Sequence, residues 1–192
     1  GAAASSSRPV KTLPRPLYDG DPLALVKLCG GFWSGDADEA RGLIAQGIDL
    51  DVQDQHQETA LTKAVVKGDN DIARELIRAG AALDVRGGYE KKTALIYAAD
   101  LNNTDIAREL VHAGATLDLQ DGRRQNQNTA LICATAKGHT DLARELIRAG
   151  AALDVQDNKI QKTALIHAVM KGNAEIARAL IEAGAALDVQ DG

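Results

Sequence analysis

Apolar side chains recur at helical spacing in two short segments, seen most clearly in the stretch that follows Thr59. Each segment has an apolar stripe along one face of a helix. The stripe consists of Leu61, Ala64 and Val65 in the first segment, and of Ile72, Leu76 and Ile77 in the second. Thr59 is a suitable N-cap, and Gly68 suits the end of the first segment because glycine readily adopts a left-handed conformation. Asp71 lies near the positive end of the second helix dipole, and Gly80 closes that helix. The pattern predicts two short antiparallel helices packed through their apolar stripes.

This pattern recurs along the chain at a nearly fixed interval. The triplets Thr-Ala-Leu and Ala-Gly-Ala each occur four times, with spacings of 34, 36 and 34 residues. An earlier, more degenerate copy has Gly35 and Gly47 in the places of Gly68 and Gly80. Together they define five units, at about residues 21–50, 51–83, 84–117, 118–153 and 154–192. Self-similarity of this period predicts a solenoid, in which each unit buries its apolar face against its neighbours.

The units resemble the ankyrin repeat, whose pattern runs T-P-L-H-x-A-A, then G-H-x-x-I-V, then L-L-x-x-G-A-D-V-N. The fifth unit matches it with Thr163 to Val169, Gly172-Asn173, Ile176-Ala177 and Leu180 to Ala185. Over about residues 22–192 the resemblance implies an all-α ankyrin-repeat solenoid of five helix-turn-helix units joined by β-hairpin-like finger loops. Isoleucine or threonine replaces the family's histidine, so its usual Thr–His hydrogen bonds are not expected. Aspartate replaces the loop asparagine at Asp51, Asp84, Asp118, Asp154 and Asp188.

The resemblance also implies that a partner protein binds on a concave face, formed by the fingers and the exposed side of each first helix. The fingers correspond to residues 55–58, 87–92, 122–128 and 157–162. The third is about three residues longer than usual, which makes Arg123, Arg124 and Gln125 candidate contacts, although a harmless solvated insertion explains the length equally well. Further candidates on the fingers are Tyr89, Lys91, Lys92 and Lys159.

Two columns of helix positions vary between units while the apolar stripes stay constant, so we expect both columns to face the groove. One consists of Lys63, Tyr97, Cys133 and His167; the other consists of Trp33, Val66, Asp100, Ala136 and Met170. Trp33 has the alternative role of a core residue at the N-terminal end, and Tyr97 and Met170 that of ordinary helix surface. The lysines and arginines make this face more basic than the rest of the chain, which favours an acidic or polar partner.

Composition excludes several functional classes. The chain carries a net charge of −5 without a basic block, which argues against nucleic acid as a partner. No apolar run approaches the roughly 18 residues of a membrane span. Aromatic residues make up 3% of the chain and alanine contributes 34 residues, so the core must consist of small and aliphatic side chains. Cys29 and Cys133 lie three units apart and are not expected to form a disulfide.

No catalytic residue, metal site or cofactor is predicted. Cys133 and His167 suggest a nucleophile and its base, but helices of neighbouring units lie about 8–10 Å apart, too far for a catalytic pair. The function predicted is a non-catalytic protein-protein interaction scaffold. An alternative is an accessory protein that carries or chaperones a cofactor such as haem, because Tyr97, Cys133 and His167 are residue types that can bind haem iron.

Residues 1–20 form a separate segment, rich in alanine, serine and proline, for which we expect an extended tail. A small-residue start of this kind can follow a removed signal peptide, and it can equally be a linker; we favour a periplasmic or secreted location over a cytoplasmic one. At the other end, the fifth unit keeps the apolar stripe of an internal unit. We therefore expect this end to contact a partner, a second copy of the chain or residues beyond the given sequence.

Overall fold

The computed structural model describes residues 20–30, 36–122, 127–158 and 161–187. Within these ranges the chain forms ten α-helices and no strand. The helices, in chain order, are α1 Ala24–Gly30, α2 Ala37–Ala45, α3 Ala60–Lys67, α4 Asn70–Arg78, α5 Ala94–Asp100, α6 Thr104–His112, α7 Ala130–Lys137, α8 Thr140–Arg148, α9 Ala164–Met170 and α10 Ala174–Glu182. They follow one another as five antiparallel pairs, which confirms the predicted all-α solenoid.

The helix ends lie where the local sequence places them. The side chain of each repeated threonine accepts a hydrogen bond from the backbone N–H three residues later, at Thr59, Thr93, Thr129 and Thr163. Gly68 and Gly138 end α3 and α7 in the left-handed conformation, with φ angles of 77° and 78°. Asn102 takes the equivalent place after α5 with a φ of 58°, a conformation that asparagine tolerates better than most residues.

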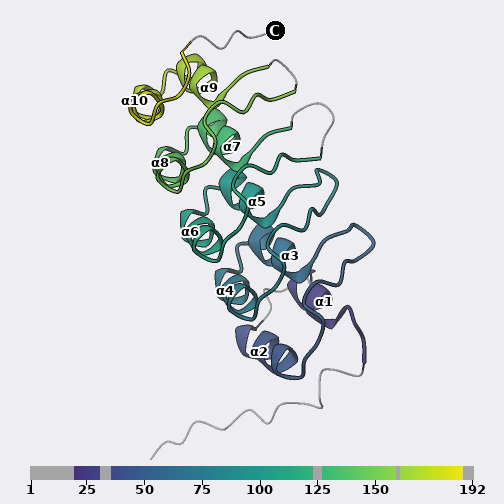
Figure 1. The fold of residues 1–192 in the computed structure, drawn as a ribbon. Coiled ribbons are helices and arrows are strands. Elements are labelled where there is room, and N and C mark those ends of the chain that lie inside the picture. Colours follow the sequence, from purple (N-terminus) through teal and green to yellow (C-terminus); the bar gives the residue numbers. More distant parts are fainter. Residues whose placement is uncertain (1–19, 31–35, 123–126, 159–160, 188–192) are drawn as a thin grey trace, which may run out of the picture.

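The helices stack in two layers (Figure 1). The odd-numbered helices form a layer beside the projecting finger loops, which we call the inner layer, and the even-numbered helices form the outer layer. Each helix contacts the next helix of its own layer and its partner in the same unit. Small residues make this close stacking possible: the alanines at the centres of four inner helices, Ala64, Ala98, Ala134 and Ala168, have no exposed surface. The shortage of aromatic residues thus matches a thin, alanine-rich core.

Two series of polar contacts repeat along the chain. The aspartates that replace the family's loop asparagine stand at the start of a unit, and each accepts a backbone N–H near the end of the same unit, in the pairs Asp51–Ala82 (2.8 Å), Asp84–Thr116 (3.0 Å), Asp118–Ala152 (2.8 Å) and Asp154–Ala186 (2.9 Å). On the outer layer, arginines pair with glutamates of the next unit, in Arg41–Glu75 (3.2 Å), Arg74–Glu109 (3.8 Å), Arg108–Glu145 (3.6 Å) and Arg144–Glu175 (3.4 Å). The first series joins the two ends of a unit, and the second supplements the apolar contacts between units.

A membrane-spanning helix is not found in the described ranges, since none of their helices is both long and apolar enough to cross a bilayer.

Candidate functional site

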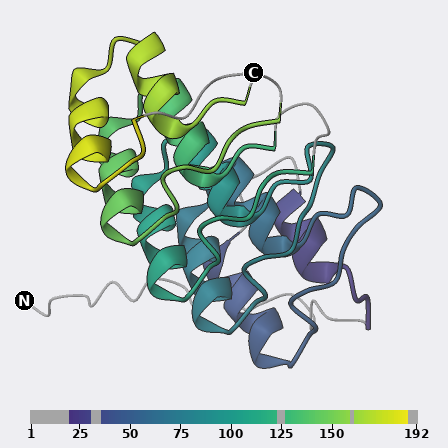
Figure 2. The same cartoon turned by 45° about the horizontal axis from the view of Figure 1, so that its top comes forward.

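The finger loops form one continuous row along the inner layer (Figure 2). A backbone hydrogen bond closes each finger at its base, joining residues 54 and 58, 87 and 92, 121 and 128, and 157 and 162. Neighbouring fingers are also joined, because Gly88 N donates to His56 O at 3.0 Å and Gly122 N donates to Lys91 O at 3.1 Å. Backbone hydrogen bonds therefore join the described parts of the first three fingers to one another.

The first predicted column of helix residues faces the bases of the fingers. Lys63 Nζ lies 2.7 Å from Asp54 Oδ2. His167 Nε2 lies 2.8 Å from Asp157 Oδ2 in the same relative position of the fifth unit. The side chains of Lys63 and His167 are only 18% and 15% exposed, and Cys133 is 5% exposed. The sequence predicted that these side chains face the groove and are available to a partner. In the structure they are buried or half-buried, and Lys63 and His167 each join a helix to its own finger.

Tyr97 fills the same position in the third unit, where glycine replaces the aspartate. Its hydroxyl group donates a hydrogen bond to Gly87 O at 3.1 Å. A Cβ atom at Gly87 would lie 2.7 Å from Gln57 O of the neighbouring finger, and one at Gly88 would collide with the Tyr97 hydroxyl. Burial, and secondarily the charge of Glu58, raise the pKa of Tyr97 above its ordinary value. The tyrosine and the two glycines thus fit one another.

Asp100, in the second column, is the centre of an ion-pair network. Its carboxylate lies 3.2 Å from Lys92 Nζ and 2.8 Å from Lys137 Nζ, and Lys92 also pairs with Glu90. Burial opposes ionisation of Asp100, but the hydrogen bond from Lys137 and the charge of Lys92 outweigh it, so the pKa of Asp100 is lowered. Burial alone would lower the pKa of Lys92, yet the Glu90 hydrogen bond and the Asp100 charge raise it. Lys92 is 7% exposed as a whole residue, so it contributes to the network more than to the surface.

Exposed apolar side chains mark the remaining part of this face. Tyr89 on the second-to-third-unit finger is 90% exposed, and Val66 and Met170 are 42% and 62% exposed at the last turns of α3 and α9. Sequence reasoning missed Leu101, which is 50% exposed directly after α5. The signal was present in the sequence, because the other three units place a lysine at this position, Lys67, Lys137 and Lys171.

The remaining candidates divide into two groups. Lys91 is exposed on its finger. Five predicted contact residues lie outside the described ranges: Trp33, Arg123, Arg124, Gln125 and Lys159.

The two cysteines are free thiols in α1 and α7, and burial raises the pKa of Cys29 and of Cys133 to about 12. A thiol in this environment is neither a nucleophile nor a ready metal ligand at neutral pH.

The comparisons with known proteins agree with this architecture. The family model of ankyrin repeats (3 copies) matches residues 32–121 and again residues 116–191. None of the curated protein sequences matches this chain. Ankyrin repeats generally mediate protein-protein interactions and are typically not catalytic. With most of its length matched by the family model, the chain belongs to the ankyrin repeat family.

Proposed function

We propose that this protein is a non-catalytic scaffold that binds a partner protein through its finger face, meaning the finger loops together with the exposed side of the inner helices. The observation that carries the proposal is the exposure of Tyr89, Val66 and Leu101 on this face. Large apolar side chains in water are the usual anchors of protein interfaces, and tyrosine is enriched among the residues that dominate binding energy. The backbone bonds between fingers support it further, because a rigid surface loses little entropy on binding.

The charges of the finger face favour an acidic or polar partner segment. Lys91 and Lys171 are exposed there, whereas the nearby carboxylate of Asp100 is paired with Lys92 and Lys137. An acidic segment would pair with the exposed lysines, and added salt should slow its association.

The haem-carrying alternative gains no support from the geometry. The Tyr97 hydroxyl donates to Gly87 O, His167 Nε2 pairs with Asp157, and Cys133 is buried. These three side chains therefore serve contacts within the chain, and we do not propose a haem-binding function.

The test compares variants on the finger face with one on the outer layer. Leu101→Gln is the most informative change, because glutamine removes the apolar surface without adding a charge and the position is half exposed, so the fold should be unaffected. Tyr89→Ala removes the exposed aromatic ring. Arg78→Glu, at a site that is 66% exposed on α4, is the control on the outer layer, where it reverses a surface charge.

Wild-type protein is used to capture partners from an extract of the organism that makes it, and the affinity of a purified partner is then measured by calorimetry. We expect Tyr89→Ala and Leu101→Gln each to weaken binding by about tenfold, equivalent to about 1.4 kcal/mol, and Arg78→Glu to leave it unchanged. Loss of binding in Arg78→Glu with full binding in the two other variants would show that the outer layer is the binding surface.

We further propose that the fifth unit pairs with a second copy of the chain. Its outward side chains are exposed, namely Val169 (66%), Met170 (62%), Ile181 (50%) and Leu187 (73%). Val65, at the position of Val169 in the second unit, is fully buried by the unit that follows. Arg178 and Glu182 are both exposed one turn apart on α10, so an antiparallel pair of α10 helices would place opposite charges together.

A further inference from the structure

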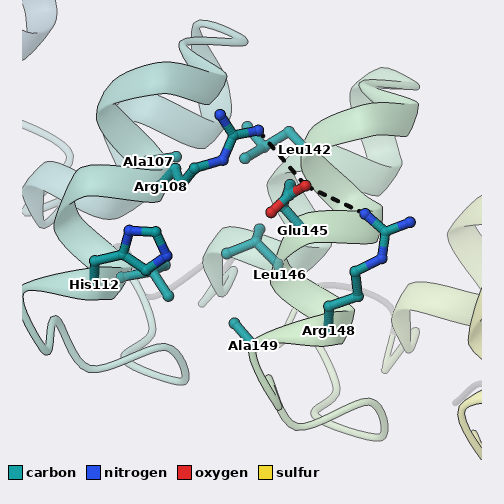
Figure 3. A pocket seen from close by; sticks show the side chains of 9 residues that line it. Ala107, Arg108, His112, Leu142, Glu145, Leu146, Arg148 and Ala149 are labelled. Atoms are coloured by element: carbon teal, nitrogen blue, oxygen red, sulfur yellow. Dashed lines mark hydrogen bonds and ion pairs between the residues drawn. The ribbon is translucent and has the colours of Figure 1, made fainter.

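The outer layer carries a pocket of about 220 Å³ between α6 and α8, away from the finger face (Figure 3). Its floor is apolar: Ala107, Leu142 and Leu146 are each 1% exposed. Side chains with nitrogen-bearing groups surround this floor, with Arg108 and His112 on the α6 side and Arg148 on the α8 side. The pocket thus combines an apolar floor with a rim of two arginines, a histidine and the carboxylate of Glu145.

A substitution within the repeat pattern explains why the pocket lies here. Val111 lines it, whereas the equivalent residues of α4 and α8 are Ile77 and Ile147. Valine is shorter by one methylene group, so the side chain leaves space that isoleucine would fill. His112 similarly stands where α4 and α8 carry Arg78 and Arg148. Both departures place a smaller side chain at the same part of the outer layer.

The charges on the rim favour an anion. Glu145 Oε1 lies 3.6 Å from Arg108 Nη2 and 3.2 Å from Arg148 Nη1, so two guanidinium groups share one carboxylate. Figure 3 shows Arg108 reaching Glu145 from α6 and Arg148 reaching it from its own helix, α8, beside the apolar floor. Asp105 lies 4.0 Å from Arg108 and is an exposed, distant second partner. An incoming carboxylate can therefore pair with guanidinium N–H groups that Glu145 does not use.

We propose that this pocket binds a small aromatic carboxylate, with the ring on the Ala107–Leu142–Leu146 floor and the carboxylate beside Arg108 and Arg148. The volume suits a single aromatic ring with a short side chain. A ligand that carries both groups can use both parts of the pocket, since an uncharged ring would form no ion pair with Arg108 or Arg148. The site is separate from the finger face, so it does not depend on the proposed partner protein.

The probe is 3-phenylpropionate, compared with its uncharged amide, 3-phenylpropionamide. Binding is followed by the backbone amide chemical shifts of the full chain. We expect a dissociation constant near 1 mM, as suits a ligand of about eleven heavy atoms, with shifts confined to α6 and α8. The amide should bind at least about fivefold more weakly, since it lacks the charge that the guanidinium groups attract.

Two matched substitutions test the location. Val111→Ile restores the isoleucine of the neighbouring units and should weaken binding at least about fivefold by filling the pocket. Ile77→Val makes the reverse change between α4 and α6, and should leave the affinity unchanged. Equal binding of the probe by wild type and Val111→Ile, shifts spread over all units, or equal affinity for acid and amide would each overturn the proposal.

Discussion

The network around Asp100 allows a quantitative prediction for the Asp100→Ala variant. This change removes the carboxylate that joins Lys92 to Lys137, at 3.2 Å and 2.8 Å respectively. The two lysines differ sharply in exposure, since the side chain of Lys92 is 9% exposed and that of Lys137 is 48% exposed. Losing the same carboxylate should therefore cost far more at Lys92 than at Lys137.

The magnitude follows from this difference in exposure. Removing one partner of a fully buried ion pair costs about 3–5 kcal/mol, whereas an exposed pair contributes about 0–1 kcal/mol. Lys92 keeps Glu90 as a second partner, and Asp100 itself is 23% exposed, so the buried value must be reduced. We expect Asp100→Ala to lower the free energy of unfolding by about 1.5–2.5 kcal/mol, and Lys137→Ala to lower it by less than about 0.5 kcal/mol.

The assay is urea unfolding of both single variants and of the double variant, followed by circular dichroism at pH 7 and at pH 3. Folding lowers the pKa of Asp100, so its stabilising effect is complete above the ordinary aspartate pKa and is lost as the pH falls through the lower folded value. The difference between wild type and Asp100→Ala should therefore shrink at pH 3. Single variants with equal, small effects at pH 7 would refute the view that Lys92 depends on Asp100.

Three further predictions concern other parts of the chain. Because burial raises the pKa of Cys29 and Cys133 to about 12, alkylation at pH 8 should be at least about 100-fold slower in the folded chain than in urea; equal rates would show that the thiols are accessible. Asp118→Ala should lower the free energy of unfolding by about 1 kcal/mol through loss of the bond that joins the start of its unit to the end, whereas Asp118→Asn, which keeps an acceptor oxygen, should cost less than half as much; equal losses would assign the effect to charge. Replacing Val169 and Met170 by lysine should abolish self-association in sedimentation velocity, and a wild-type chain that stays monomeric at high concentration would contradict the proposed pairing.

Local signals predicted the helices well because their causes are local. A threonine that caps a helix and a glycine that ends one act through backbone groups within three or four residues, so Thr59 and Gly68 identified α3 from sequence alone. The apolar stripes likewise predicted which helix faces are buried. The repeat supplied the long-range order, since each unit shows how its neighbours must pack.

The contacts of the candidate site were harder to predict, because they join a helix to a loop across a turn. Lys63 and His167 vary between units in the manner of surface residues, but they contact Asp54 and Asp157 of their own fingers. The pocket beside Val111 depends on one methylene group and on the approach of two helices, which no sequence period reveals. A position can therefore vary between units because it makes a different contact within the chain, or because it lies where an outside molecule can bind. The sequence alone does not distinguish these two cases.

The structure helps to distinguish the two cases, because it shows whether a residue that departs from the repeat makes a specific contact within the chain. Gly87 departs from the aspartate of three other units, and Tyr97, at a position that differs in every unit, contacts it: the Tyr97 hydroxyl donates to Gly87 O and leaves no room for a side chain at Gly88. Leu101 and Val111 also depart from the repeat: Leu101 exposes an apolar side chain where three other units have lysine, and Val111 lines a pocket where α4 and α8 have isoleucine. Departures that change an exposed surface or the lining of a pocket are where a repeat protein can gain a contact with an outside molecule, and both binding proposals are tested at these two positions.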